Sequence, residues 1–308
     1  MKKMLVKVTN KILSLHEVEE IITLLYLKTY SIATFFSKYA VNKKYGKMKK
    51  VTVDVQGIKV IFSTEDSYSR FWLYTRCDRN KIHEENVTNL LAKNLKSCKC
   101  FIDVGANLGY YTLLASKLMP NGVIYTFEMD KSNYTLLEKN LKLNKCNNVR
   151  GYHAALSDSR GIVSYIGDSK HPNPMFSLSV DKSKAKSEQT ISVQAITMDD
   201  FLKDKKSIPD VIKIDVEGAE MKVIRGMQNL LGKSNLKLFV ELHPIQLILK
   251  FQSSANAVIS MLIDRGYDVF EITNMRGPSK DNISLRKLTQ EDKLIHNTML
   301  YAYKRELN

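Results

Sequence analysis

Residues 101–112 read FIDVGANLGYYT, and this segment decides the fold. A short apolar strand runs into a glycine-containing loop, and the residues after the loop open a helix. Glycines at 105 and 109 let the backbone turn tightly and approach a ligand, while the first turn of the helix offers unpaired N–H groups. The segment therefore predicts a cofactor site at the edge of a parallel sheet, for either S-adenosylmethionine or a dinucleotide.

Two features separate these cofactors. The dinucleotide fingerprint needs a third glycine, in the spacing G-x-G-x-x-G, and the loop lacks it. Asp103 lies inside the strand, where it can meet the cationic end of a methionine moiety, and the second strand ends at Glu128, whose carboxylate can accept both ribose hydroxyls. The sequence thus favours S-adenosylmethionine, with a predicted binding set of Asp103, Gly105, Ala106, Asn107, Gly109, Glu128, Ala155 and Asp215.

The chain after this loop alternates between apolar strands and helices of about a dozen residues, which is typical of βαβ units and a mostly parallel sheet. The last two strands have no helix between them, so we expect an antiparallel closing strand. A Ser- and Lys-rich stretch, 167–190, interrupts the alternation and is predicted to be a mobile flap. The expected strands are 100–104, 122–128, 148–155, 191–196, 210–216, 237–242, 267–272 and 297–303; the expected helices are 109–119, 131–143, 219–230 and 254–265.

The segment before the loop lacks the alternation of apolar strands and helices. Residues 51–62 alternate around a Gln56-Gly57 turn, which predicts a β-hairpin. Residues 21–37 are the most apolar stretch, but Lys28 interrupts them and no signal-type cleavage site follows. We expect a cytoplasmic protein with a helical, basic appendage at 1–80 and a catalytic domain at 81–308. The apolar helix could pack on that domain or make peripheral membrane contact within 1–50.

Charge and cysteine content narrow the partners. The 47 Lys and Arg exceed the 32 Asp and Glu, and residues 1–50 hold eleven Lys against three Glu. More than half of the excess therefore lies in residues 1–50, where a solvated basic face is the simplest interpretation, and nucleic acid is not the favoured partner. The four cysteines form neither a CxxC pair nor a disulfide-like array.

Charged residues gather on two later strands. In the strand 210–216 and just after it, Lys213, Asp215 and Glu217 share one face, because side chains alternate along a strand. Glu241, near the end of the strand 237–242, and His243, just after it, repeat the pattern. A central parallel strand is normally apolar on both faces, so these charges predict a ligand-filled cavity at the carboxyl ends of two neighbouring strands.

This cluster supports more than one chemistry. Methyl transfer to an alcohol needs the acceptor aligned behind the methyl group and its proton removed. His243, with an ordinary pKa near 6.5, suits the base and Asp215 the orienting group; the reverse assignment is also open. A carboxylate-histidine cluster could instead hold Mg²⁺ or Ca²⁺, but no metal ligand is assigned.

Five segments in order resemble the FkbM family of class I methyltransferases, over about residues 80–303. The resemblance implies a Rossmann-like, seven-stranded, mostly parallel sheet and methyl transfer to a hydroxyl oxygen of a sugar, glycan or other small molecule. Where that family commonly has a proline after the ribose-binding acid, this chain has Met129-Asp130. The segments are 101–112, 127–128, AALSD at 154–158, TMDDF at 197–201 and, as the most specific one, IKIDVEGAE at 212–220.

Two rival functions remain at this level. A nucleic-acid methyltransferase would explain the basic charge, but the chain has no N-P-P-Y-like motif and no Pro-Cys pair. A non-catalytic cofactor-binding module is disfavoured because Asp215 and His243 are both present.

Overall fold

The computed structural model describes residues 40–78, 81–167, 189–233, 235–276 and 283–304. The chain divides into two compact units, Met1–Met48 and Lys49–Asn308. Of the first unit only residues 40–48 are described, and residues 40–45 are helical. The apolar segment 21–37 and its predicted membrane contact lie outside the described residues. Among the helices that are described, none combines the length and hydrophobicity that a membrane span requires.

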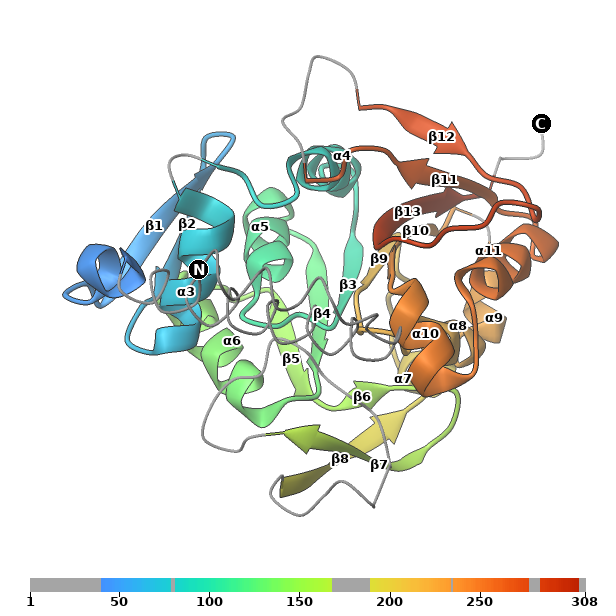
Figure 1. Ribbon diagram of the computed structural model, residues 1–308, viewed down its shortest axis with the longest axis horizontal. Coiled ribbons are helices and arrows are strands. Elements are labelled where there is room, and N and C mark those ends of the chain that lie inside the picture. Colours follow the sequence, from blue (N-terminus) through green and yellow to red (C-terminus); the bar gives the residue numbers. More distant parts are fainter. Residues whose placement is uncertain (1–39, 79–80, 168–188, 234, 277–282, 305–308) are drawn as a thin grey trace, which may run out of the picture. The chain divides into compact units, whose positions relative to one another are not determined.

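A mixed eight-stranded sheet forms the centre of the second unit (Figure 1). Its order is β12-β11-β13-β10-β9-β3-β4-β5. The five strands from β10 to β5 are parallel, and β13 runs antiparallel between β10 and β11. The expected class I sheet with an antiparallel closing strand is thus confirmed, with the short β12 added at its edge. The strands are β3 (Cys100–Val104), β4 (Val123–Glu128), β5 (Val149–His153), β9 (Val211–Ile214), β10 (Lys237–Leu242), β11 (Asp268–Ile272), β12 (Leu285–Lys287) and β13 (Thr298–Tyr303).

Helices cover both faces of this sheet, and each face has its own apolar core. Phe101, Val211 and Phe239 face the core shared with α4, α5 and α6, whereas Ile102 and Ile212 face the core shared with α8, α9 and α11. The helices are α3 (Ser67–Cys77), α4 (Glu85–Leu95), α5 (Tyr110–Leu118), α6 (Lys131–Leu143), α7 (Met198–Leu202), α8 (Glu220–Arg225), α9 (Gln228–Leu231), α10 (Pro244–Phe251) and α11 (Ala255–Asp264).

The predicted hairpin is present as β1 (Lys50–Val55) and β2 (Ile58–Ser63). It belongs to the same compact unit as the sheet, which begins at Lys49, whereas the sequence interpretation assigned everything up to residue 80 to an appendage. The reason is side-chain packing. Phe62 and Trp72 are buried in the core with α5, and the Asn140 side chain of α6 accepts a hydrogen bond of 2.8 Å from the Ser63 N–H.

A three-stranded sheet stands apart from the central one, in the order β6-β8-β7. It is built from β6 (Ala155–Leu156), β7 (Gly161–Gly167) and β8 (Gln189–Ile196), so the strand expected at 191–196 does not join the main sheet. Tyr165, Val193 and Ala195 bury their side chains in a small core of their own. The predicted flap lies almost wholly at residues 168–188, which are outside the described part of the chain.

Candidate functional site

The glycine loop joins β3 to α5, as the sequence predicts. Gly105 has a φ of 78°, and a Cβ built on it would meet the Asp215 carbonyl oxygen at 1.8 Å. Gly109 has a φ of 96°, and its Cβ would meet Leu137 at 2.6 Å. Only glycine satisfies both the left-handed backbone and the close approach. The loop is therefore pressed against the end of β9, which joins the expected cofactor loop to the charged cluster.

Glu128 ends β4 directly beside this loop. Its Oε2 accepts a hydrogen bond of 2.7 Å from the Asn107 N–H, and its Oε1 accepts one of 2.8 Å from the Asp130 N–H. Burial raises the pKa of Glu128 to about 7, although the two backbone donors oppose the shift. Each carboxylate oxygen has a second lone pair, so Glu128 can fix the loop and still accept a hydroxyl donor.

Asp103 lies deeper in β3, in a fully buried position. Its Oδ2 accepts a hydrogen bond of 2.6 Å from the Thr112 hydroxyl, and Lys213 Nζ stands 3.9 Å from Oδ1. In the described part of the chain Oδ1 has no hydrogen-bond partner. Burial raises the pKa of Asp103, and the nearby Lys213 charge opposes that shift. Asp103 therefore offers one unsatisfied acceptor beneath the loop.

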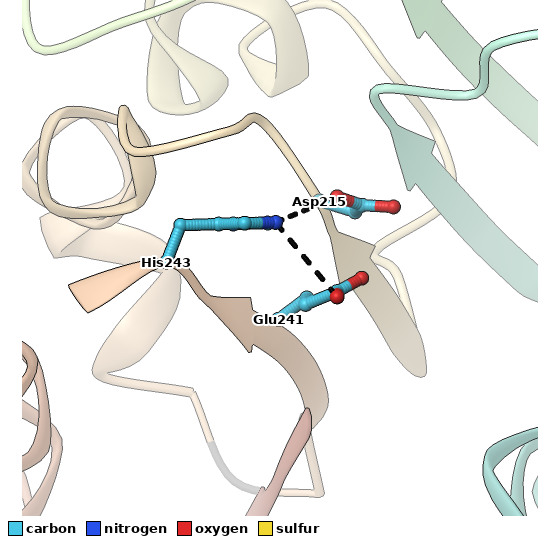
Figure 2. A group of neighbouring side chains, drawn as sticks. All are labelled: Asp215, Glu241 and His243. Atoms are coloured by element: carbon cyan, nitrogen blue, oxygen red, sulfur yellow. Dashed lines mark ion pairs between the residues drawn. The ribbon is translucent and has the colours of Figure 1, made fainter. Parts of the chain in front are cut away.

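The strands β9 and β10 are parallel neighbours, as expected, and bring Asp215, Glu241 and His243 together (Figure 2). One ligand atom from each of the three lies within 4.8 Å of the others. Strand β9 ends at Ile214, so Asp215 is the first residue beyond it, and His243 caps α10 after β10 ends at Leu242. The cluster thus stands at the carboxyl edge of the sheet, where open α/β sheets bind ligands.

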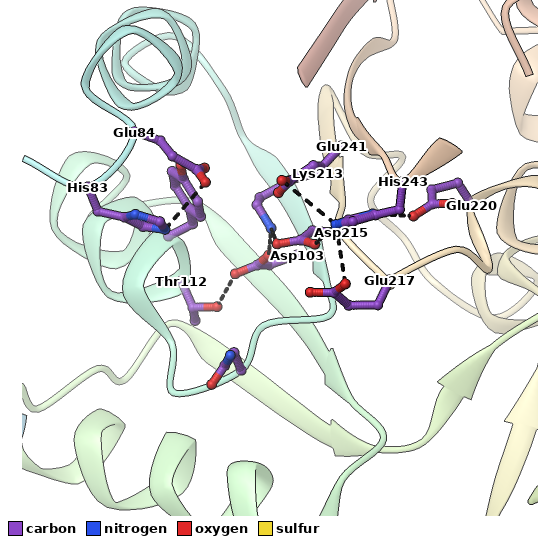
Figure 3. A network of polar contacts seen from close by, with 12 residues as sticks. His83, Glu84, Asp103, Thr112, Lys213, Asp215, Glu217, Glu220, Glu241 and His243 are labelled. Atoms are coloured by element: carbon purple, nitrogen blue, oxygen red, sulfur yellow. Dashed lines mark hydrogen bonds and ion pairs between the residues drawn. The ribbon is translucent and has the colours of Figure 1, made fainter. Parts of the chain in front are cut away.

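His243 is held among carboxylates (Figure 3). Its Nδ1 is 2.8 Å from Glu220 Oε1, and its Nε2 is 3.4 Å from Glu217 Oε2 and 3.7 Å from Glu241 Oε1. Burial by itself would lower the pKa of His243, but the hydrogen bond to Glu220 and the surrounding negative charges raise it to about 10. At neutral pH His243 is therefore an imidazolium, hydrogen-bonded to Glu220 through Nδ1 and with Nε2 facing carboxylates. The environment does not favour it as a proton acceptor.

The carboxylates around His243 are not equivalent. Burial raises the pKa of Glu217 to about 7, and burial together with Asp215 and Glu84 raises the pKa of Glu241 well above its usual range. Burial would also raise the pKa of Asp215, but Lys213 and His243 hold it below its ordinary value. Asp215 is thus the anion of this group, while Glu217 titrates near neutrality.

Glu217 reaches the cluster from a turn and not from the strand. It has a φ of 52°, an uncommon backbone conformation for a residue with a side chain. Its side chain is 28% exposed, whereas that of Glu241 is 5% exposed. A strained backbone at a partly exposed carboxylate is typical of functional sites.

Lys213 is buried under the same cluster. Its Nζ is 3.2 Å from Asp215 Oδ2 and lies 4.9 Å from the centre of the Tyr111 ring. Burial acts to lower the pKa of Lys213, but Asp215 and Asp103 outweigh it and keep the pKa above its ordinary value. Lys213 therefore stays charged and links Asp103 to Asp215.

The structure also places residues that the sequence interpretation did not assign. Glu220 orients His243. It lies inside the motif at 212–220, and this position in the motif could have identified it as a site residue. Glu84 and Arg276 come from outside the charged strands, and no local pattern marks them. Ala106 donates its N–H to the Phe127 carbonyl oxygen at 3.0 Å, and Ala155 lies in the smaller sheet as part of β6.

The glycine loop, the strand-end acid and the charged sheet edge together are typical of the Rossmann-like fold of class I methyltransferases. The chain belongs to the FkbM methyltransferase family, because the Methyltransferase FkbM domain matches residues 103–269. This membership confirms the family expected from the sequence, and the expected cofactor, S-adenosylmethionine, agrees with it.

Curated relatives are identical to this chain at about a quarter of the aligned positions. Hexuronic acid methyltransferase AglP of Haloferax volcanii is 27% identical over 161 residues, which are 52% of this chain and 62% of that protein. Methyltransferase 1 of Beauveria bassiana is 26% identical over 144 residues, 42% of this chain and 58% of that one. The chain thus spans about three fifths of the length of the relatives it matches.

Solved structures with a similar arrangement include the FkbM methyltransferase of Methylobacillus flagellatus. That structure has a TM-score of 0.42 and 16% identity, and the match covers 67% of this chain and 43% of that one. An S-adenosylmethionine-dependent O-methyltransferase of Thermotoga maritima has a TM-score of 0.39 and 13% identity, with 85% and 80% covered.

Proposed function

We propose that this chain moves a methyl group from S-adenosylmethionine to a hydroxyl oxygen of a small-molecule or glycan acceptor. The observation that carries the proposal is the contact between the glycine loop and the charged sheet edge, where Gly105 leaves no room for a Cβ beside the Asp215 carbonyl. A cofactor bound along the loop would present its reactive end to the carboxylates after β9 and β10. The name of the relative AglP, a hexuronic acid methyltransferase, supports a sugar acceptor.

The residues at the loop fit the cofactor. Glu128 has acceptor capacity left on both oxygens for ribose hydroxyls, and Asp103 holds a buried, unsatisfied oxygen. The sulfonium and ammonium groups of the cofactor are cationic. A positive charge nearby favours the ionised form of crowded carboxyl groups and lowers their pKa. Asp215, Glu217 and Glu241 would each be favoured as anions once the cofactor is bound.

The protein's own contribution to the reaction is alignment and proton transfer. S-adenosylmethionine, when bound, would supply an electrophilic methyl carbon for in-line attack by the acceptor oxygen, with S-adenosylhomocysteine as the leaving group. Asp215, fixed by Lys213 and adjoining the loop, orients the reacting groups. The buried imidazolium of His243, held by Glu220, keeps a hydrogen-bond donor fixed beside Glu217 and Glu241.

Glu217 is our choice for the group that accepts the hydroxyl proton. Its pKa of about 7 suits a base at neutral pH, and it is the more exposed of the two acids beside His243 Nε2. As the new O–C bond forms, the proton passes to the Glu217 carboxylate. This assignment replaces His243 as the preferred base and gives it a supporting role.

The three ligand atoms of Asp215, Glu241 and His243 also permit a divalent cation. Such an ion would bind a diol acceptor and lower the pKa of its hydroxyl. To bind His243, the ion would have to displace a proton from the imidazolium. It would also replace the contacts that this proton makes with the neighbouring carboxylates, so we propose the metal-free route.

Labelled S-adenosylmethionine, mixed with the protein and a fractionated glycan and small-molecule extract, tests the proposal. We expect label in a hydroxyl-bearing fraction and the release of S-adenosylhomocysteine. The variant Glu217→Gln should still bind the cofactor, with turnover lowered by about 10²- to 10⁴-fold, the usual contribution of a positioned base. Absence of transfer to any fraction by wild-type protein that binds the cofactor would contradict the proposed activity.

A further inference from the structure

A pocket of about 660 Å³ lies where α3 ends and α4 begins, next to the turn that follows β11. Its ionisable lining consists of the cations Arg76, Lys81 and Arg276, the acids Glu84 and Glu85, and His83. This volume is within the range of pockets that hold small organic ligands, and a single sugar unit would fit. None of these residues belongs to the glycine loop or the strand ends, so the pocket can take a second ligand.

The pocket adjoins the charged cluster through one side chain. Arg276 places Nε 4.0 Å from Glu84 Oε1 and an Nη atom 3.5 Å from Glu241 Oε1. Glu241 in turn lies 3.7 Å from His243 Nε2. In Figure 3 His83 and Glu84 face the same network from the opposite side to His243. A ligand in the pocket is therefore separated from Glu241 by the Arg276 side chain, and Glu241 lies beside the same imidazole nitrogen as Glu217.

Three cationic side chains and two carboxylates line the pocket, so the cations are in excess by one. Arg76 lies over the Trp72 ring, with its guanidinium carbon 5.3 Å from the ring centre, and Lys81 is exposed. Neither is ion-paired with a carboxylate in the described ranges of the chain. Glu84 is turned inward, since its side chain is 5% exposed and accepts a hydrogen bond of 2.8 Å from the Tyr111 hydroxyl. Arg76 and Lys81 are therefore available to a ligand, whereas the Glu84 carboxylate is already hydrogen-bonded to Tyr111 and ion-paired with Arg276.

His83 gives the pocket a neutral polar group. Its ring packs edge-on against Trp72 at 5.0 Å and Tyr110 at 5.1 Å, and its Nε2 is 3.8 Å from Glu84 Oε1. Burial lowers the pKa of His83 to about 4, so the ring is uncharged at neutral pH. An uncharged imidazole can accept a hydrogen bond from a hydroxyl without competing for an anion.

We propose that this pocket is the acceptor site and that it selects a sugar bearing an anionic group. Arg76, Lys81 and Arg276 would bind the carboxylate or phosphate of that sugar, because a guanidinium matches either group with paired hydrogen bonds. The hydroxyls would face His83 and the carboxylate cluster. This inference rests on the proposed function and adds to it the charge of the acceptor and the place where it binds.

Three sugars that differ in one group test the proposal: glucose, glucuronate and glucose 6-phosphate. Binding to the full chain, saturated with S-adenosylhomocysteine, is measured by saturation-transfer NMR, so that the result does not depend on turnover. We expect one or both acidic sugars to bind at least about tenfold more tightly than glucose. Preference for glucuronate alone would assign a carboxylate, and preference for glucose 6-phosphate alone a phosphate.

Two variants locate the effect. Arg76→Gln and Lys81→Gln should each weaken acidic-sugar binding by about tenfold and leave glucose and S-adenosylhomocysteine binding unchanged. Lys96→Gln, an exposed lysine beyond the other end of α4, is the matched control. The inference would be overturned if all three sugars bind equally or if none binds. It would also be overturned if acidic-sugar binding is unchanged in both variants. Failure to bind S-adenosylhomocysteine would instead count against the proposed function.

Discussion

The proton on His243 can be tested directly, because the structure gives its pKa an unusual value. In an unfolded chain the imidazole titrates near 6.5, and in the folded protein its pKa is about 10. Between these values the folded state holds one more proton than the unfolded state. The stabilising contribution of His243 is therefore complete below pH 6.5 and is lost as the pH rises through 10.

The size of this effect follows from the same two values. One bound proton changes the free energy of unfolding by about 1.4 kcal/mol per pH unit, so His243 accounts for a loss of up to about 3 kcal/mol between pH 7.5 and 9.5. Over the whole window its contribution is at most about 5 kcal/mol, the product of the pKa difference and that slope. Urea unfolding at the two pH values measures the loss.

NMR of protein with labelled histidine identifies the group responsible. The His243 resonance, assigned by its absence in His243→Gln, should titrate near pH 10 in the protein without ligand. Glu220→Gln removes the carboxylate 2.8 Å from Nδ1 and should lower that pKa. A His243 titration near 6.5 in the wild-type protein would refute the reasoning and restore His243 as a candidate base.

Four other predictions concern the cofactor, the loop, metal ions and the N-terminal segment. Glu128→Ala should weaken S-adenosylmethionine binding by about 1 to 3 kcal/mol in calorimetry, and wild-type affinity should fall as the pH drops through about 7 and Glu128 becomes protonated; unchanged affinity would remove its ribose role. Gly105→Ala should abolish cofactor binding, whereas Gly57→Ala, with a similar φ of 83° and nothing within 4 Å, should retain it and lose only some stability; equal effects would show that backbone strain and not the contact with Asp215 matters. A chelator should leave turnover intact, and activity that is lost with EDTA and restored by Mg²⁺ or Ca²⁺ would instead support the metal route. A chain beginning near Met48 should fold and bind the cofactor, as circular dichroism and calorimetry can show, because Lys49–Asn308 is a compact unit; an unfolded product would mean that the first 48 residues complete the core.

The sequence by itself determined the features that depend on short spacings. The cofactor loop follows from two glycines between one strand and one helix, and Gly105 and Gly109 adopt the left-handed backbone that this spacing implies. The sharing of one face by Lys213 and Asp215 follows from strand alternation. The pairing of β9 with β10 follows from the class I order that the motif implies, and it brings Asp215, Glu241 and His243 together.

The tertiary structure alone decided the boundary of the catalytic unit. The hairpin and α3 read as an appendage because their sequence shows no link to the loop. In the fold Phe62 and Trp72 pack with α5, and the Tyr68 hydroxyl donates a hydrogen bond of 3.0 Å to the Asn107 side chain of the loop. Packing between segments far apart in the chain leaves no periodic signal in either one.

Protonation and the acceptor pocket were likewise decided only in three dimensions. A pKa depends on burial and on charges that other elements supply, so the ordinary value of histidine suggested a base, whereas in the fold Glu220 and Asp215 keep His243 protonated. The pocket joins Arg76 at the end of α3 to Arg276 after β11, some two hundred residues later. Local patterns fix which elements form, whereas the electrostatics of a site depend on which elements the fold brings together.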